Sequence, residues 1–141
     1  MRRTPKIKVV IDTNVLISSL WGGKPQRIIE IWDKNEIFVL VSQQILDEYF
    51  DVLNRFDLTE EDIEDITILF ANPNKTILLE PGIKLNVIET DVDDNKFLEC
   101  AKSGNADYII SGDRHILEIE AFENIKIVTV TKFLEIIRQS T

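Results

Sequence analysis

The sequence predicts an α/β fold with a central, mostly parallel sheet of four to five strands. Two observations support this fold class. Several apolar runs, such as Val9–Ile11, are continuous and rich in β-branched residues, as in strands buried on both faces of a parallel sheet. These runs alternate with segments whose apolar residues recur at helical spacing. Such alternation covers both faces of the sheet with helices through right-handed crossovers.

The first half of the chain supplies two buried strands. Residues 7–11 form the first strand, and a short helix is predicted over 15–21. A second helix starts at Pro25, because proline suits a first helical turn. A strand over 38–41 follows, and Ser42 is the expected N-cap of a third helix.

The middle of the chain is less regular. Thr59 is the expected cap of a fourth helix, whose acidic first turn suits the helix dipole. Short extended pieces are predicted over 76–79 and 85–88, and one of them is expected to be an edge strand. A helix over 97–101 then ends at Gly104.

The last part of the chain returns to the strand and helix pattern. A buried strand is predicted over 106–110, followed by a short helix over 114–119. A final strand over 125–130 leads to Thr131, the expected cap of the last helix.

Composition fits one globular domain over residues 1–141, with a basic tail over residues 1–6. A single cysteine excludes an intramolecular disulfide, and no apolar run approaches the roughly 18 residues of a membrane span, so we expect a cytoplasmic protein. The net charge of −9 repels a polyanion unless cations or a local basic surface intervene. It also predicts that any protein partner is basic.

Four carboxylates are expected at one edge of the sheet. Asp12 and Asp113 each follow a buried strand directly. Asp94 starts the helix that leads into the second of these strands, and Glu48 lies in the helix after strand 38–41. Because the carboxyl ends of parallel strands meet at one edge, these side chains can converge. Taken singly, Asp12 is equally a helix cap and Glu48 a solvated side chain.

Convergent carboxylates repel one another unless they share a cation or a proton. The sequence has no Cys/His pair with zinc spacing, and an all-oxygen site suits Mg²⁺ or Mn²⁺. Such a site supports in-line attack of a metal-activated water on a phosphodiester. No GxSxG, P-loop or GxGxxG motif points instead to acyl transfer, nucleotide hydrolysis or dinucleotide binding.

Four motifs together resemble those of the PIN domain, and more narrowly the VapC-like toxins of bacterial and archaeal toxin–antitoxin pairs. They are Val9–Leu16, Glu48, Asp91–Ala101 and Ala106–Asp113. The resemblance runs from Lys8 to Phe133. It implies a three-layer α/β/α sandwich and a metal-dependent endoribonuclease, the toxin of a type II toxin–antitoxin pair.

The resemblance also implies roles for individual residues. The acidic quartet around Mg²⁺ or Mn²⁺ would be Asp12, Glu48, Asp94 and Asp113. Asp91 would be an outer carboxylate, and Asn14 and Ser111 would order the site by hydrogen bonds.

Two positions depart from the family pattern. The pattern can carry an acid where Asn95 stands, which leaves either Asp93 or Asp94 as the ligand. Many relatives carry an acid where this chain has His115, which leaves the number of metal ions open.

Partners follow from the same resemblance. Four basic residues lie in segments expected to border the site and to contact the backbone of an RNA substrate, although each is equally well an ordinary surface charge. They are Lys24, Arg27, Lys96 and Arg114. A basic antitoxin segment would reach into the acidic cleft, and we expect a homodimer.

Two other functions fit parts of the pattern. The first is a catalytically incompetent PIN-like module that binds RNA or protein, which the intact quartet argues against. The second is a Mg²⁺-dependent phosphatase of the haloacid-dehalogenase type, which needs a second Asp where Asn14 stands.

Overall fold

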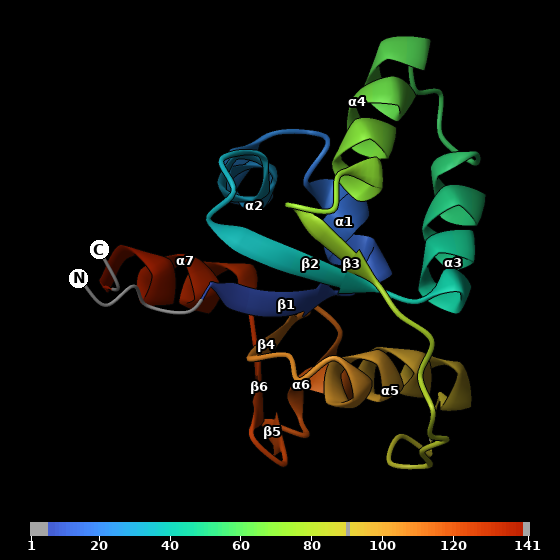
Figure 1. Cartoon of the computed structure of the whole chain (residues 1–141), viewed down its shortest axis with the longest axis vertical. Helices are drawn as coiled ribbons and strands as arrows, with labels where there is room; N and C mark the ends of the chain where they lie inside the picture. The colour runs from blue at the N-terminus through green and yellow to red at the C-terminus, as the bar shows by residue number, and fades with distance from the viewer. Residues whose placement is uncertain (1–5, 90, 140–141) are drawn as a thin grey trace.

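The computed structural model of this chain describes residues 6–89 and 91–139 and contains a six-stranded sheet (Figure 1). The strand order is β3-β2-β1-β4-β6-β5, and every neighbouring pair is parallel except β5 and β6. The strands are β1 (Ile7–Ile11), β2 (Ile37–Val41), β3 (Thr76–Leu78), β4 (Tyr108–Ile110), β5 (Ala121–Phe122) and β6 (Ile125–Val128).

Helices cover both faces of this sheet. They are α1 (Thr13–Ser18), α2 (Gly23–Asp33), α3 (Gln43–Leu53), α4 (Glu60–Ala71), the 3₁₀ turn η1 (Val92–Asp94), α5 (Asn95–Ser103), α6 (Arg114–Leu117) and α7 (Val130–Gln139). The sheet grows from β1 toward β3 in one direction and toward β6 in the other, so right-handed crossovers place the connecting helices on opposite faces. Accordingly, α5 packs on β1, β2 and β4, whereas α2 packs on β2 and against α7. The predicted three-layer α/β/α arrangement is confirmed.

The central strands form the core. Val9, Val10, Val39, Leu40 and Ile109 are fully buried, as expected for strands with helices on both sides. A carboxylate cannot continue such a run without an internal partner, and the acids therefore stand where the strands end. The predicted caps Ser42 and Thr59 are confirmed, because their hydroxyls accept hydrogen bonds from the backbone of α3 and α4.

The sheet has more strands than the four to five predicted. The addition is β5, a two-residue antiparallel strand that is too short to show any periodicity. The strand predicted over 125–130 ends at Val128, and α7 begins at Val130. Thr131 is therefore not the cap of this helix. Thr129 has that position, and its hydroxyl accepts a hydrogen bond from the Lys132 N–H at 3.1 Å.

Of the two extended pieces in the middle of the chain, only the first is a strand, and β3 is the predicted edge strand. The segment over 85–88 pairs with side chains instead. Its backbone N–H groups donate to Glu99 and Asn95 of α5. Residues 1–5 of the predicted basic tail lie outside the described residues. Within those residues, no helix has the length and apolar character needed to cross a membrane.

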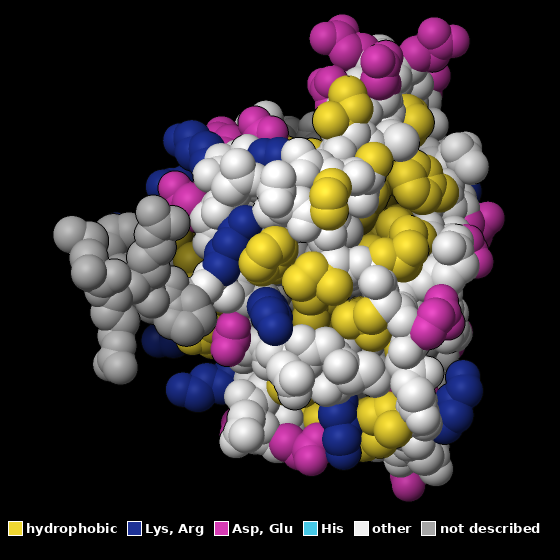
Figure 2. All heavy atoms as spheres, in the orientation of Figure 1, with side chains coloured by type: hydrophobic (Ala, Val, Ile, Leu, Met, Phe, Trp, Pro, Cys, Tyr) yellow, Lys and Arg dark blue, Asp and Glu magenta, His cyan; other side chains and the backbone are white. Residues whose placement is uncertain are grey.

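Acidic side chains are spread unevenly over the surface. Figure 2 shows several of them gathered at the tip of α4, whose first turn contains Glu60, Glu61 and Asp62. This tip lies at the far end of the α3–α4 hairpin from the sheet (Figure 1). Part of the net negative charge therefore lies away from the sheet edge where the predicted site residues stand.

Candidate functional site

The predicted acidic residues line one cavity of about 230 Å³, which we call the acid pocket. It contains five carboxylates that come from four separate segments of the chain. The pocket residues are Asp12, Thr13, Asn14, Glu48, Val52, Asp91, Asp94, Phe97, Asp113 and Ile116. The expected convergence of residues 12, 48, 94 and 113 is therefore present in the structure.

Asp12 joins two strand ends. Its side chain is almost fully buried and caps α1 by accepting a hydrogen bond from the Val15 N–H at 2.8 Å. Its other oxygen accepts from the Ser111 hydroxyl and from the Gly112 N–H, at 3.2 Å, beyond the end of β4. Burial raises the pKa of the Asp12 carboxyl, although these hydrogen bonds oppose the shift. The capping role and the pocket position thus belong to the same side chain.

Ser111 organises the β4 end of the pocket. It is fully buried, and its N–H donates to the Val128 carbonyl of β6 at 2.9 Å. Its hydroxyl donates to Asp12 and accepts from the Asp113 N–H at 3.0 Å. Asp113 in turn caps α6 by accepting from the His115 N–H at 2.7 Å. One hydroxyl therefore sets the relative position of two pocket carboxylates.

Glu48 is held by contacts on both of its oxygens. The Thr13 hydroxyl donates to one, and the Lys96 ammonium lies 2.7 Å from the other. The next residue, Tyr49, is fully buried and donates its hydroxyl to the Ile11 carbonyl at the end of β1. This bond anchors α3 to the same strand end that carries Asp12, which explains why Glu48 reaches the pocket.

Lys96 is the structure's main departure from the expected surface charges. Its side chain is 2% exposed, and its ammonium lies 2.8 Å from the Asp93 carboxylate as well as near Glu48. Burial alone would lower the pKa of Lys96, but its bonds to Asp93 and Glu48 raise it. The same lysine lowers the pKa of Asp93. Lys96 is therefore an internal counter-ion, because its burial and its two carboxylate partners leave no exposed ammonium for RNA.

This contact separates the two adjacent aspartates that the sequence left as alternatives. Asp93 pairs with Lys96 and does not line the acid pocket, whereas Asp94 does. Burial comes first, and the charges of Asp91 and Asp113 come next, in raising the pKa of Asp94 to about 6. Asp94 is thus the pocket aspartate, in surroundings that disfavour its negative charge.

Asn95 holds the segment that carries these aspartates, a role that the sequence did not reveal. Its amide donates to the carbonyls of Ile88 and Val92, at 3.0 and 2.9 Å. Its oxygen accepts from the N–H groups of Val87 and Ile88, at 3.0 and 2.9 Å. An ionised acid has no donor and could not make the first pair of bonds. The amide therefore explains why this chain has Asn and not an acid at this position.

The remaining predicted residues lie at different distances from the pocket. Asn14 lines it, whereas Lys24 and Arg27 line a separate cavity between α2 and α7. Arg114 follows Asp113, is highly exposed, and lies 3.6 Å from Glu118. His115 is exposed and contributes its backbone N–H to the Asp113 cap.

The donor set fits a hard divalent cation, because every ionisable lining group of the pocket is a carboxylate. Crowding of negative charge around Asp94 is also what a cation would relieve. In the described part of the chain, however, no group of three or more His, Cys, Asp or Glu side chains stands ready to hold a metal ion. The carboxylates share a cavity without forming a closed ligand set.

Comparison with known proteins decides the family. The PIN domain family profile matches residues 8–115, which include every carboxylate of the acid pocket.

The chain belongs to the PIN domain family.

Two known proteins show how far the similarity extends. An uncharacterized protein of Methanocaldococcus jannaschii, MJ1680, is 37% identical over 120 residues, which are 81% of this chain and 76% of that protein. The crystal structure of VapBC2 from Rickettsia felis bound to a DNA fragment from their promoter matches with a TM-score of 0.58. That match covers 87% of this chain and 98% of the other at 12% identity, and it shows a shared fold.

Membership of the family sets the general chemistry. PIN domains are generally nucleases and typically use divalent metal ions. In this PIN domain, the acid pocket gathers the oxygen ligands that such chemistry requires.

Proposed function

We propose that this PIN domain is a Mg²⁺- or Mn²⁺-dependent endoribonuclease that hydrolyses phosphodiester bonds in the acid pocket. One observation carries the proposal: five carboxylates from four segments of the chain line a single cavity at the carboxyl edge of the sheet. Assembling so much negative charge costs free energy that an apolar or neutral lining would avoid. A site for cations accounts for that cost.

Four carboxylates would hold the cation, with Asp91 as an outer acid. They are Asp12, Glu48, Asp94 and Asp113. A bound divalent cation would supply a nucleophilic water near neutral pH and neutralise charge on a phosphodiester.

The surrounding hydrogen bonds would keep these ligands ionised and oriented. Asp12 receives three hydrogen bonds from β4 and α1 neighbours, which favour its charged form. Glu48 is held between Thr13 and Lys96, so it is already oriented before a cation arrives. Asn14, at the pocket wall, would orient water or a phosphate oxygen through its amide.

We also propose that the chain is the toxin of a type II toxin–antitoxin pair. The fold shared with VapBC2 supports an antitoxin partner. The partner expected here carries a basic segment that enters the acid pocket, because the cavity concentrates negative charge. The reading frames beside this one test the pairing, since a toxin should have a small neighbouring gene for its partner.

The nuclease proposal is tested by incubating the purified chain with a fluorescent single-stranded RNA in Mn²⁺, Mg²⁺ or EDTA. The variants are Asp12→Asn and Asp94→Asn, which keep side-chain size and remove a charge. Asp65→Asn is the matched control, because Asp65 is exposed on α4 and outside the pocket. Circular dichroism and thermal melting check that each variant is folded.

We expect cleavage that requires the divalent ion, persists in Asp65→Asn and is lost in both pocket variants. RNA binding without cleavage by the native chain would favour the binding module. Turnover of small phosphate esters without RNA cleavage would favour a phosphatase. Either result would overturn the nuclease proposal.

A further inference from the structure

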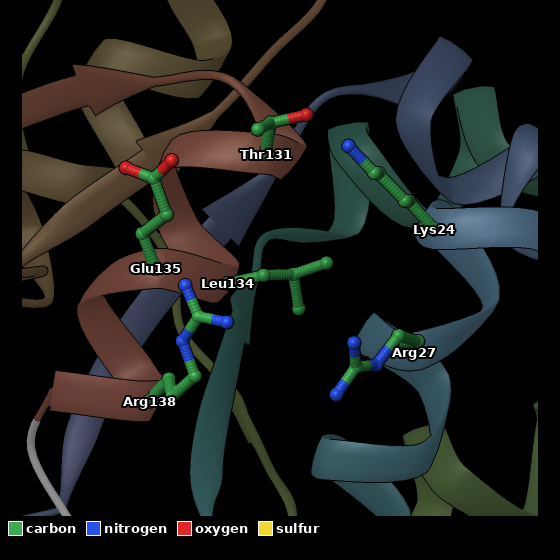
Figure 3. A pocket seen from close by; sticks show the side chains of 6 residues that line it. All are labelled: Lys24, Arg27, Thr131, Leu134, Glu135 and Arg138. Atoms are coloured by element: carbon green, nitrogen blue, oxygen red, sulfur yellow. The ribbon is translucent and has the colours of Figure 1, made fainter.

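A second cavity, of about 200 Å³, lies between α2 and α7 (Figure 3). We call it the α2–α7 pocket. Lys24 and Arg27 come from α2, and the rest of the lining comes from α7. The α7 residues are Thr131, Leu134, Glu135 and Arg138.

The lining of this pocket is positive although the chain as a whole has a net charge of −9. Three of its six lining residues are cations, and only Glu135 is an anion. In Figure 3, Arg27 and Arg138 extend toward each other from the two helices, and Lys24 extends toward Thr131. Lys24 and Arg27 are exposed and form no ion pair with a side chain in the described part of the molecule. Their charge is available to a ligand.

The topology puts one end of this pocket at the same sheet edge as the acid pocket. Helix α7 begins two residues after the carboxyl end of β6, and the Val128 carbonyl there accepts from the N–H of Ser111. Helix α2 leads to the amino end of β2, which is parallel to β1, so α2 also starts at the carboxyl edge. Lys24 and Thr131 stand at these helix starts. A negative and a positive pocket therefore open toward one edge of the sheet.

We infer that the α2–α7 pocket binds a backbone phosphate of the RNA strand, some distance along the strand from the bond that the acid pocket cleaves. The inference rests on the proposed ribonuclease function. Arginine and lysine are the usual ligands of backbone phosphates, and the Thr131 hydroxyl adds a neutral donor. The cavity has room for a phosphate group and several waters, since a water occupies about 30 Å³.

The lining favours a polyanion such as RNA over an acidic peptide. Leu134 is its one apolar residue, whereas a bound peptide helix uses several apolar anchors along a groove. A phosphate site next to a negative catalytic pocket also solves a problem of charge. It supplies local attraction for a strand that the net charge of −9 repels.

The test measures RNA binding in EDTA, where the proposed metal-dependent cleavage cannot occur. A fluorescent 12-nucleotide single-stranded RNA is titrated with the native chain and with the double variant Lys24→Gln/Arg27→Gln at several salt concentrations. The matched control is Lys84→Gln/Lys126→Gln, which removes two exposed lysines outside this pocket. A dinucleotide, a polyglutamate peptide and inorganic phosphate are used as competitors.

We expect the double variant to bind the 12-nucleotide RNA about tenfold more weakly, with a salt dependence reduced by about 1.4 in log–log slope for two lost phosphate contacts. The control should retain its affinity and its slope. In the presence of Mn²⁺, the same variant should raise KM for RNA cleavage and leave kcat unchanged. Because the binding arm needs no cleavage, it tests this pocket even if the chain is not a nuclease.

Equal losses in the double variant and the control would overturn the inference, since they would reflect general charge alone. Displacement of RNA by polyglutamate at matched charge would overturn it in favour of an acidic protein partner. A native chain that binds no RNA in EDTA or in Mn²⁺ would also overturn it.

Discussion

The two sides of the acid pocket differ in how their charge is balanced. On one side, Glu48 lies against the buried ammonium of Lys96, which also holds Asp93. On the other side, Asp94 faces Asp91 and Asp113 and has a pKa raised to about 6 by burial and by those charges. The chain therefore supplies its own cation to one side only.

This difference shows how a protein can direct an external cation. A buried lysine fixes one carboxylate without removing it from the pocket wall, so part of the site is rigid beforehand. The unbalanced aspartates then provide the electrostatic attraction. A uniformly neutralised pocket would attract no cation, and a uniformly negative one would be harder to fold.

The adjacent aspartates offer the sharpest way to break this comparison. We expect Asp94→Asn to lower kcat/KM for RNA cleavage by about 100-fold or more, because losses at metal-site residues reach this size. Asp93→Asn should leave kcat/KM within a few-fold of the native value, since Asp93 lies outside the pocket. Equal losses in the two variants would show that the two sides are not distinct.

Metal binding should stabilise the native chain through its unbalanced side. At a Mn²⁺ concentration one hundred times the Kd, the free energy of unfolding should rise by about 2.7 kcal/mol. Urea denaturation measures this gain, with NaCl at equal ionic strength as the control. The gain should persist in Asp93→Asn and vanish in Asp94→Asn. If it persists in both, the cation binds elsewhere.

Removing the internal cation tests the balanced side. Lys96→Met should lower the free energy of unfolding by about 2 kcal/mol, less than for a fully buried pair because Glu48 is 28% exposed. Lys102→Met makes the same substitution in the same helix, at an exposed ion pair, and should cost less than about 1 kcal/mol. Denaturant unfolding of both variants without metal measures the difference. Equal costs would mean that Lys96 contributes no more than a surface lysine.

The smallest expected effect concerns the hydrogen bonds that orient Asp12. Ser111→Ala removes one of three donors to this carboxylate and should lower the free energy of unfolding by about 1 kcal/mol. Ser103→Ala, at an exposed position of α5, is the control and should change stability by less. A destabilisation no larger than that of the control would show that the Ser111 hydroxyl is dispensable.

The parts that the sequence predicted well depend on local patterns. Apolar runs identify the central strands, and the serine and threonine before α3 and α4 identify their caps, because the side chain and the backbone it binds are three residues apart. The pocket aspartates Asp12 and Asp113 could be placed because each directly follows a buried strand. Parallel topology then requires neighbouring strands to end at one edge.

The parts that could not be predicted depend on contacts between distant segments. Lys96 has Asp93 three residues earlier, a spacing typical of a solvated ion pair on a helix. Its burial follows from the approach of α3, which the Tyr49 hydroxyl anchors to β1. The bonds of Asn95 to Val87 and Ile88 are likewise formed by a loop with no regular pattern. Such loops leave no periodic signal in the sequence.

The short outer strands also limit how this protein can associate with other chains. The two borders of the sheet are β3, with three residues, and β5, with two, so little unpaired backbone is offered to a neighbouring sheet. Ribbon-to-ribbon growth into larger sheets is disfavoured at both borders. A stable companion would instead meet the helical layers or the loops that follow the strands.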